Sequence, residues 1–139
     1  MKDGRGQSNE KVQRERMSHA HTRTVCIVDD DEAVRDSLRL LLESRGLATR
    51  SFASADAFLQ AGAPQMACLI LDLHMPGTSG LELLRLLRTR GQSQPVFVVS
   101  GRRDPRLDAE IQAAGATDLL SKPFDDEVLL SLVLDAVAA

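Results

Sequence analysis

The chain has 139 residues, of which 43% are hydrophobic and 27% are charged, and its formal net charge at pH 7 is −3. This length suits a single domain, and this composition is ordinary for a soluble globular protein. No apolar run reaches the ~18–20 residues of a membrane-spanning helix and no secretory signal opens the chain, so we expect a cytoplasmic protein whose two cysteines, Cys26 and Cys68, stay reduced.

Charge is distributed unevenly along the chain. Residues 1–23 contain six Lys or Arg, three Asp or Glu and few apolar residues, which predicts a flexible N-terminal tail before one domain at residues 24–139. The domain has seventeen acidic and eleven basic residues, a balance that disfavours direct binding to nucleic acid. Lys122 is its only lysine, beside ten arginines, which raises the question of what this amine does.

The first half of the domain alternates short apolar runs with helical patterns. Residues 24–28 are a β-branched run that predicts a strand, and residues 33–45 show helical spacing that stops at Gly46. Residues 48–53 predict a more polar strand, suited to the edge of a sheet. Ser54 can then cap a short helix, so two strand–helix units follow one another.

The same alternation continues to the end of the chain. Apolar runs predict strands at residues 66–71, 95–99 and 117–121, and helical spacing predicts helices at 81–90 and 104–114 and a final helix from its cap, Asp125, to Ala138. Continuous apolar strands separated by helices are typical of a parallel sheet that is covered on both faces. The sequence therefore predicts an α/β fold of five βα units, a doubly wound parallel five-stranded sheet.

Polar side chains stand where the predicted strands end. Asp29 and Asp30 follow the first strand, Asp72 the third, Ser100 the fourth and Lys122 the fifth. In an open parallel sheet, the carboxyl ends of the strands lie along one edge, where ligand sites form. We therefore expect three carboxylates, one hydroxyl and one ammonium group to lie close together.

This set of groups suits reversible phosphorylation of Asp72. Three carboxylates repel one another unless a cation joins them, and a sparse set of oxygen ligands favours Mg²⁺. The Asp72 carboxylate can attack phosphorus to give an aspartyl phosphate, while Ser100 donates a hydrogen bond to one phosphoryl oxygen and Lys122 neutralises another. Each residue alone has an ordinary explanation as a turn, cap or surface residue, and we expect Asp31 to cap the first helix. These ordinary explanations do not account for the occurrence of all of these residues together at the ends of four strands.

Several motifs make residues 24 to about 137 similar to the receiver domains of two-component response regulators. They are Val-Asp-Asp-Asp-Glu (28–32), Leu-Asp-Leu-His-Met-Pro-Gly-Thr-Ser-Gly (71–80), Val-Ser-Gly (99–101) and Lys-Pro-Phe (122–124). Ser-Phe-Ala-Ser-Ala at residues 51–55 further resembles receivers of the FixJ type. The resemblance implies the flavodoxin-like strand order 2-1-3-4-5.

The resemblance also implies roles for individual residues. Asp72 would accept a phosphoryl group from a sensor histidine kinase, and Mg²⁺ would be bound by Asp29, Asp30, Asp72 and the backbone carbonyl of His74. Ser100 and Lys122 would bind the phosphoryl group, and the bond between Lys122 and Pro123 would be cis. Such a domain is no enzyme in the ordinary sense, because it phosphorylates and dephosphorylates only itself.

Leu119 departs from the family pattern. Receivers usually have Tyr or Phe three residues before the lysine, and that ring turns inward as the hydroxyl residue moves toward the phosphate. Leu119 has neither a ring nor a hydroxyl group, so we expect phosphorylation to be coupled only weakly to the protein surface.

The alternative function is an aspartyl-phosphate phosphohydrolase of the haloacid-dehalogenase type. Those enzymes resemble this chain in their strand-end Asp, Ser or Thr, and Lys, but their nucleophile follows the first strand and a second Asp lies two residues on. Asp29 and Asp31 have that spacing, but the Thr expected to follow is missing and 139 residues leave no room for the usual cap domain.

The last helix carries more apolar residues than one buried face needs. Ten of the twelve residues at 128–139 are apolar, and only Ser131 and Asp135 interrupt them. Some apolar side chains are therefore expected to point away from the sheet, which predicts a surface for a homodimer or an output partner.

Overall fold

The computed structural model describes residues 24–62 and 64–139, so the predicted tail at residues 1–23 lies outside the described residues. Strands and helices alternate in the described part of the chain: β1 (Thr24–Val28), α2 (Glu32–Glu43), β2 (Ala48–Phe52), α3 (Ala55–Gln60), β3 (Cys68–Asp72), α4 (Gly80–Thr89), β4 (Val96–Ser100), α5 (Pro105–Ala113), β5 (Asp118–Ser121) and α6 (Asp126–Ala138). The predicted βα alternation is confirmed. The predicted element ends differ from those observed by at most two residues.

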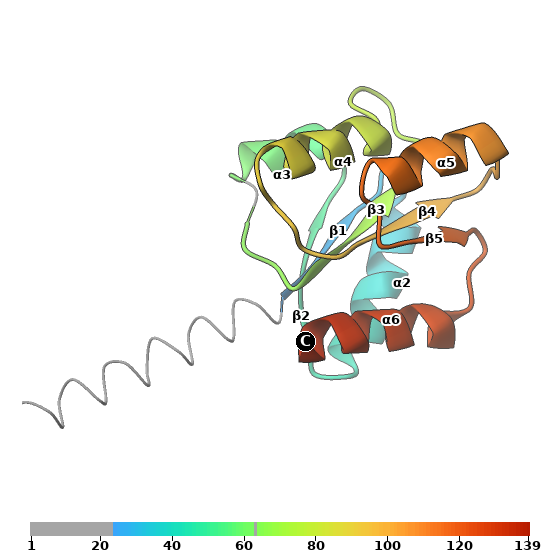
Figure 1. Ribbon diagram of the computed structural model, residues 1–139. Helices are drawn as coiled ribbons and strands as arrows, with labels where there is room; N and C mark the ends of the chain where they lie inside the picture. Colours follow the sequence, from blue (N-terminus) through green and yellow to red (C-terminus); the bar gives the residue numbers. More distant parts are fainter. Residues whose placement is uncertain (1–23, 63) are drawn as a thin grey trace, which may run out of the picture.

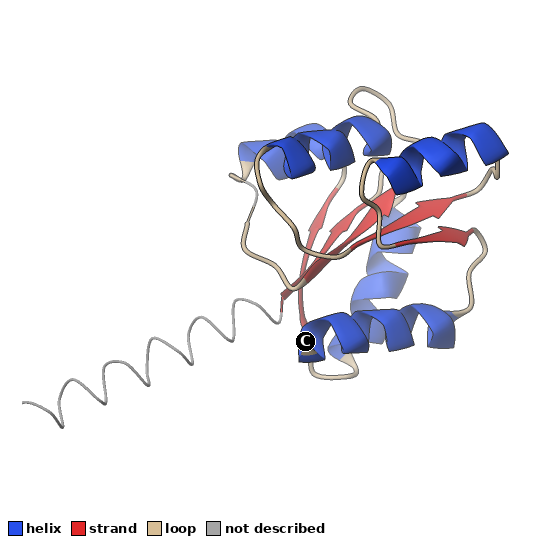
Figure 2. Ribbon diagram, in the orientation of Figure 1, coloured by secondary structure: helices blue, strands red, loops and turns tan. Residues whose placement is uncertain are grey.

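The five strands form one parallel sheet in the order β2-β1-β3-β4-β5, as expected (Figure 2). Because β3 pairs directly with β1, the residues that follow β1 lie beside the end of β3. Ser100 at the end of β4 is in register with Ser121 at the end of β5. This order brings residues from distant parts of the sequence to the same edge of the sheet.

Helices cover both faces of the sheet: α3, α4 and α5 lie on one side, and α2 and α6 on the other (Figure 1). The strands β3 and β4 are buried along their whole length, and β1 is buried except at its first residue. These strands are continuous apolar runs because both of their faces pack against helices. The more polar β2 lies at the edge of the sheet and is largely exposed, as the sequence predicts.

Polar side chains define where the helices begin. Asp31, Ser54 and Asp125 each accept a hydrogen bond from a backbone N–H of the first turn of α2, α3 and α6, as expected. Ser79 does the same for α4, and its hydroxyl accepts from the N–H of Glu82. These bonds satisfy backbone N–H groups that have no partner within the helix.

The two cysteines are reduced and buried, as the sequence predicts. Cys26 and Cys68 are free and buried, and burial raises the pKa of the Cys26 thiol to about 11 and that of Cys68 to about 12. Both thiols therefore stay protonated and unreactive at neutral pH. None of the helices in residues 24–62 and 64–139 is long and apolar enough to cross a membrane.

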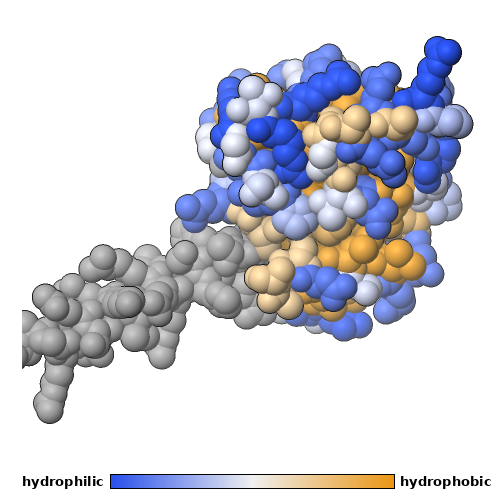
Figure 3. Space-filling model, in the orientation of Figure 1, coloured by the Kyte–Doolittle hydropathy of each residue, from blue (hydrophilic) through white to orange (hydrophobic). Residues whose placement is uncertain are grey.

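Helix α6 buries more of its apolar surface than its sequence suggests. Leu129, Leu130 and Val133 are buried in the core between α2, α6 and the sheet. Val128 is 51% exposed, and hydrophobic surface is visible between β5 and α6 in Figure 3. The expectation that some apolar residues face away from the sheet is therefore met by Val128 and, at the end of the helix, by the small Ala138, while the remaining apolar residues of α6 are buried or partly buried against the core.

Candidate functional site

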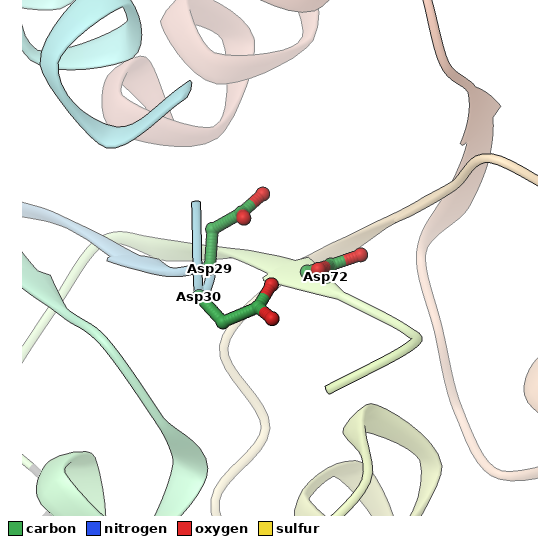
Figure 4. A group of neighbouring side chains, drawn as sticks. All are labelled: Asp29, Asp30 and Asp72. Atoms are coloured by element: carbon green, nitrogen blue, oxygen red, sulfur yellow. The ribbon is translucent and has the colours of Figure 1, made fainter. Parts of the chain in front are cut away.

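Three carboxylates meet at the carboxyl ends of β1 and β3 (Figure 4). Oxygen atoms of Asp29, Asp30 and Asp72 all lie within 4.8 Å of one another. Asp29 and Asp72 are buried, with 3% and 5% of their surface exposed, whereas Asp30 is exposed. The neighbouring strands β1 and β3 thus bring together the three acids that the sequence predicts as metal ligands.

Lys122 joins this group from the loop between β5 and α6. Its Nζ atom donates a hydrogen bond to Asp29 Oδ2 at 3.1 Å and lies 3.4 Å from Asp72 Oδ1. Burial lowers the pKa of the Lys122 amine, but hydrogen bonds and attraction from Asp29 and Asp72 outweigh it, so the pKa is raised overall. The amine is therefore a permanent positive charge between two buried carboxylates.

The carboxyl group of Asp72 is unusually basic for an aspartate. Burial is the largest cause and the negative charge of Asp29 the next, and together they raise the pKa of Asp72 to about 6, although Lys122 and the backbone N–H of His74 oppose the shift. One ammonium group thus compensates the repulsion among the carboxylates only in part. Oxygen donors in an under-compensated negative cluster fit a hard divalent cation such as Mg²⁺.

Ser100 is the last residue of β4 and is fully buried, so the fold places it at the expected edge. Its hydroxyl, however, donates a hydrogen bond to the backbone carbonyl of Arg102 and accepts one from the backbone N–H of the same residue. A buried hydroxyl needs partners, and the nearby backbone supplies them. The side chain expected to bind a phosphoryl group is therefore engaged with its own loop.

A pocket of about 510 Å³ opens over the carboxylates. It is lined by charged and polar residues from the loops after β1, β3, β4 and β5: Asp30, Asp31, Asp72, His74, Gly101, Arg102 and Lys122. Asp31 has the predicted capping role and also borders this space. The pocket has room for a small anionic group next to the carboxylate of Asp72.

A second, more apolar groove of about 490 Å³ lies next to this pocket, between α2 and the loop that precedes α6. Its lining consists of Ala33, Val34, Ser37, Leu38, Leu41, Lys122, Pro123, Phe124 and Asp126. Lys122 borders both spaces, and the Lys122–Pro123 peptide bond is cis, as expected. A partner bound in the groove would thus be in contact with the edge of the acidic pocket.

Leu119 on β5 is half-buried and packs against the hydrophobic core shared by α3, α4 and α5. The position that the sequence singled out for its missing aromatic ring is therefore occupied by an ordinary core contact.

Two residues near the site were given no role from the sequence. Gly80 begins α4, and an added Cβ atom there would lie 2.4 Å from the backbone oxygen of Asp72. Arg103 contacts residues of both α5 and β5. Gly80 closes the motif at residues 71–80, but the role of neither residue can be inferred locally, because their partners are brought to them only by the tertiary structure.

Comparisons with known proteins identify relatives of this chain. A family model described as the response regulator receiver domain matches residues 25–134. The transcriptional regulatory protein FixJ of Azorhizobium caulinodans is 49% identical over 110 residues, which are 78% of this chain and 52% of that protein. The C4-dicarboxylate transport transcriptional regulatory protein DctR of Rhodobacter capsulatus is 44% identical over 119 residues, 84% of this chain and 60% of that protein.

Solved structures agree with these relatives. The crystal structure of FixJ-N has a TM-score of 0.73 and 39% identity, and the match covers 83% of this chain and 93% of that one. A response regulator receiver protein from Pseudomonas putida has a TM-score of 0.78 and 32% identity, with coverage of 82% and 97%. The chain spans about half the length of the curated relatives it matches, and nearly all of the isolated receiver structures.

Proposed function

Since the chain belongs to the response regulator receiver domain family of two-component systems and is FixJ-like, we propose that Asp72 accepts a phosphoryl group from a sensor histidine kinase in the presence of Mg²⁺. The observation that carries this proposal is the contact of one partly buried ammonium group, Lys122, with two of three clustered carboxylates. We also propose that the domain acts on no external substrate and catalyses only its own phosphorylation and dephosphorylation.

The chemistry assigns a separate task to each residue. A carboxylate oxygen of Asp72 attacks phosphorus, the new O–P bond forms, and the P–N bond of a phosphohistidine donor breaks with its electron pair going to the imidazole nitrogen. Lys122 lies 3.4 Å from Asp72 Oδ1, where its charge offsets that of the phosphoryl oxygens. Attack by water on the same phosphorus later releases phosphate and restores the carboxylate.

The residues that would hold Mg²⁺ are Asp29, Asp30 and Asp72, together with the backbone carbonyl of His74. When bound, the ion supplies positive charge that neutralises the carboxylates and the phosphoryl oxygens. The mutual distances of the carboxylate oxygens and the raised pKa of Asp72 both support a cation at this position.

Magnesium is expected to stabilise the fold. A ligand that binds only the folded state adds about 2.7 kcal/mol at a concentration one hundred times its Kd. We therefore expect the melting temperature to rise as MgCl₂ increases into the millimolar range, and to rise much less for Asp30→Asn, which removes an exposed ligand without disturbing the core. Differential scanning fluorimetry measures both. An equal rise for the wild type and Asp30→Asn would remove Asp30 from the ligand set.

The apolar groove beside the pocket is suited to bind a helix of the protein that donates the phosphoryl group. Its apolar walls come from α2 and from the residues around Pro123, and Lys122 connects it to the acceptor site. Apolar grooves of this kind bind amphipathic helices. We assign the groove to the kinase or phosphotransfer partner, which would present its phosphohistidine at Asp72.

The direct test uses a small phosphodonor, acetyl phosphate, with Mg²⁺, followed by intact mass measurement. A single phosphoryl adduct, labile in base and absent when EDTA replaces Mg²⁺, is the expected result. Rapid release of phosphate from a generic phosphate ester would instead support the phosphohydrolase. No adduct and no turnover would contradict both functions.

The partner surface on residues 128–139 is also part of the proposal. Val128 and Leu40 are the large hydrophobic residues most exposed among those described, on α6 and α2 respectively. We expect beryllofluoride, a mimic of the phosphoryl group, to promote self-association, and Val128→Asp to weaken it more than the matched control Leu40→Asp. Sedimentation velocity with and without beryllofluoride measures this. A strict monomer in every state, or equal effects of the two variants, would contradict a homodimer surface on α6.

A further inference from the structure

Arg103 ties the loop after β4 to two neighbouring elements. Its Nε atom donates to Asp108 Oδ2 on α5 at 2.9 Å, and its Nη1 atom donates to Ser121 Oγ at the end of β5 at 2.9 Å. One guanidinium group thus links the β4–α5 loop, the first turns of α5 and the strand that leads to Lys122. We call these three residues, Arg103, Asp108 and Ser121, the tether.

Asp108 depends on this contact. Its side chain is only 18% exposed, and its second carboxylate oxygen, Oδ1, is buried without a hydrogen-bond partner among the described residues. Arg103 is therefore the group that compensates the charge of Asp108 in the part of the chain that the structure describes. A charge-assisted hydrogen bond to a partly buried carboxylate is stronger than one between exposed side chains.

The tether holds the β4–α5 loop, and the backbone of the same loop forms the hydrogen bonds with the hydroxyl of Ser100. Ser100 exchanges hydrogen bonds with the backbone of Arg102, the residue before Arg103. At its other end the loop is fixed by the backbone, because the N–H of Lys122 donates to the carbonyl of Ser100 at 2.8 Å. The segment from Ser100 to Arg103 is thus fixed to β5 at both ends.

A hydroxyl group has one proton to donate. For Ser100 to donate to a phosphoryl oxygen on Asp72, it must leave the carbonyl of Arg102, and the loop must rearrange around that lost bond. Two arrangements of the loop follow: in one the Ser100 hydroxyl donates its hydrogen bond to the carbonyl of Arg102, and in the other it donates to the phosphoryl group.

We propose that Arg103 is a positioning residue whose tether to Asp108 and Ser121 favours the arrangement in which Ser100 is bonded to Arg102, and so opposes the use of Ser100 by a phosphoryl group on Asp72. The inference rests on the proposed function of Asp72. Arg103 itself touches no reacting atom. It acts through the loop, by setting the balance between the two arrangements.

The test is the affinity for beryllofluoride in saturating Mg²⁺, followed by amide NMR titration. Loss of the tether should shift the balance toward the phosphoryl-bound arrangement, so we expect Arg103→Ala and Asp108→Asn to bind beryllofluoride about three- to tenfold more tightly than the wild type. Arg103→Lys keeps a charge for Asp108 but not the fork that reaches Ser121, and should lie between.

The matched control is Arg106→Ala, which removes the same charge from an exposed residue whose side chain makes no hydrogen bond or ion pair within residues 24–62 and 64–139. It should leave the affinity for beryllofluoride unchanged. Affinity for Mg²⁺ alone should be the same in all variants, since the tether does not touch the carboxylate cluster. A merely structural role would lower stability and weaken or leave unchanged the binding of beryllofluoride, which is the opposite direction.

The outcomes separate this inference from the proposed function. If the wild type binds no beryllofluoride, the proposed function fails and the inference fails with it. If the wild type binds but Arg103→Ala and Asp108→Asn bind equally or more weakly, only the tether is overturned. Should Arg103→Ala be too unstable to measure, Asp108→Asn and Ser121→Ala, which break the tether from its other side, decide the question in the same way.

Discussion

We expect the Asp72→Asn variant to take up no phosphoryl group from acetyl phosphate and Mg²⁺. The amide keeps the shape of the carboxylate but has no nucleophilic oxygen, and Asp72 is one of the two buried carboxylates next to Lys122 and the one that lines the pocket. Intact mass measurement of wild type and variant under identical conditions gives the result. The exposed Asp30, replaced by Asn, is the matched control: its variant should be labelled slowly, because one metal ligand is lost while the acceptor remains.

The same variant is expected to be more stable than the wild type at neutral pH without Mg²⁺. A pKa raised to about 6 means that ionisation of Asp72 is unfavourable in the folded protein. A shift of about two units corresponds to about 2–3 kcal/mol, so Asp72→Asn should gain a free energy of unfolding of about 2 kcal/mol at pH 7. For the labelling experiment, uptake of a phosphoryl group by Asp72→Asn at the wild-type rate would show that Asp72 is not the acceptor.

The stability gained by Asp72→Asn is expected to depend on pH. Because the folded protein holds the Asp72 proton more tightly than the unfolded chain does, the stabilising contribution of protonation is complete below about pH 4 and is lost as the pH rises through about 6. The difference in free energy of unfolding between Asp72→Asn and the wild type should therefore grow from pH 4 to pH 7. Urea unfolding in EDTA at several pH values measures it, and a difference independent of pH would contradict the raised pKa.

Gly80→Ala is expected to cost the most stability of any substitution near the site. The new Cβ atom would lie 2.4 Å from the backbone oxygen of Asp72 and 2.9 Å from Leu73 Cα, and backbone atoms cannot move aside as the end of a flexible side chain can. Overpacking of this kind costs about 1–3 kcal/mol or more. Helix propensity alone predicts the opposite sign, since Ala is favoured over Gly by up to about 1 kcal/mol within a helix.

The matched control for Gly80→Ala is Gly101→Ala. An added Cβ atom at Gly101 meets nothing within 4 Å, so this variant should keep the stability of the wild type. Because the added Cβ atom at position 80 would press on the backbone of Asp72, the residue that carries the acceptor carboxylate, Gly80→Ala should also bind Mg²⁺ more weakly. Chemical denaturation and Mg²⁺ titration check both statements, and a Gly80→Ala protein as stable as the wild type would show that α4 can shift away from β3.

The alternation of strands and helices followed from local pattern because each buried strand, such as β4, is a continuous apolar run with both faces covered. Capping residues such as Asp31 and Ser54 were also readable, since their partners lie two or three residues away. The behaviour of α6 was less readable. Its composition predicted that some apolar side chains point away from the sheet but not which ones: Leu129, Leu130 and Val133 are buried in the core between α2, α6 and the sheet, and Val128 is exposed.

The sequence by itself determined which residues stand at the strand ends, because that depends only on where each apolar run stops. Asp29, Asp30, Asp72, Ser100 and Lys122 could all be named in this way. The tertiary structure alone decided what these groups do to one another: the two contacts of Lys122, the shifted pKa of Asp72 and the bonds of Ser100 to its own loop. Such contacts depend on side-chain positions fixed to within about an ångström by packing between strands far apart in the chain, and no local pattern encodes them.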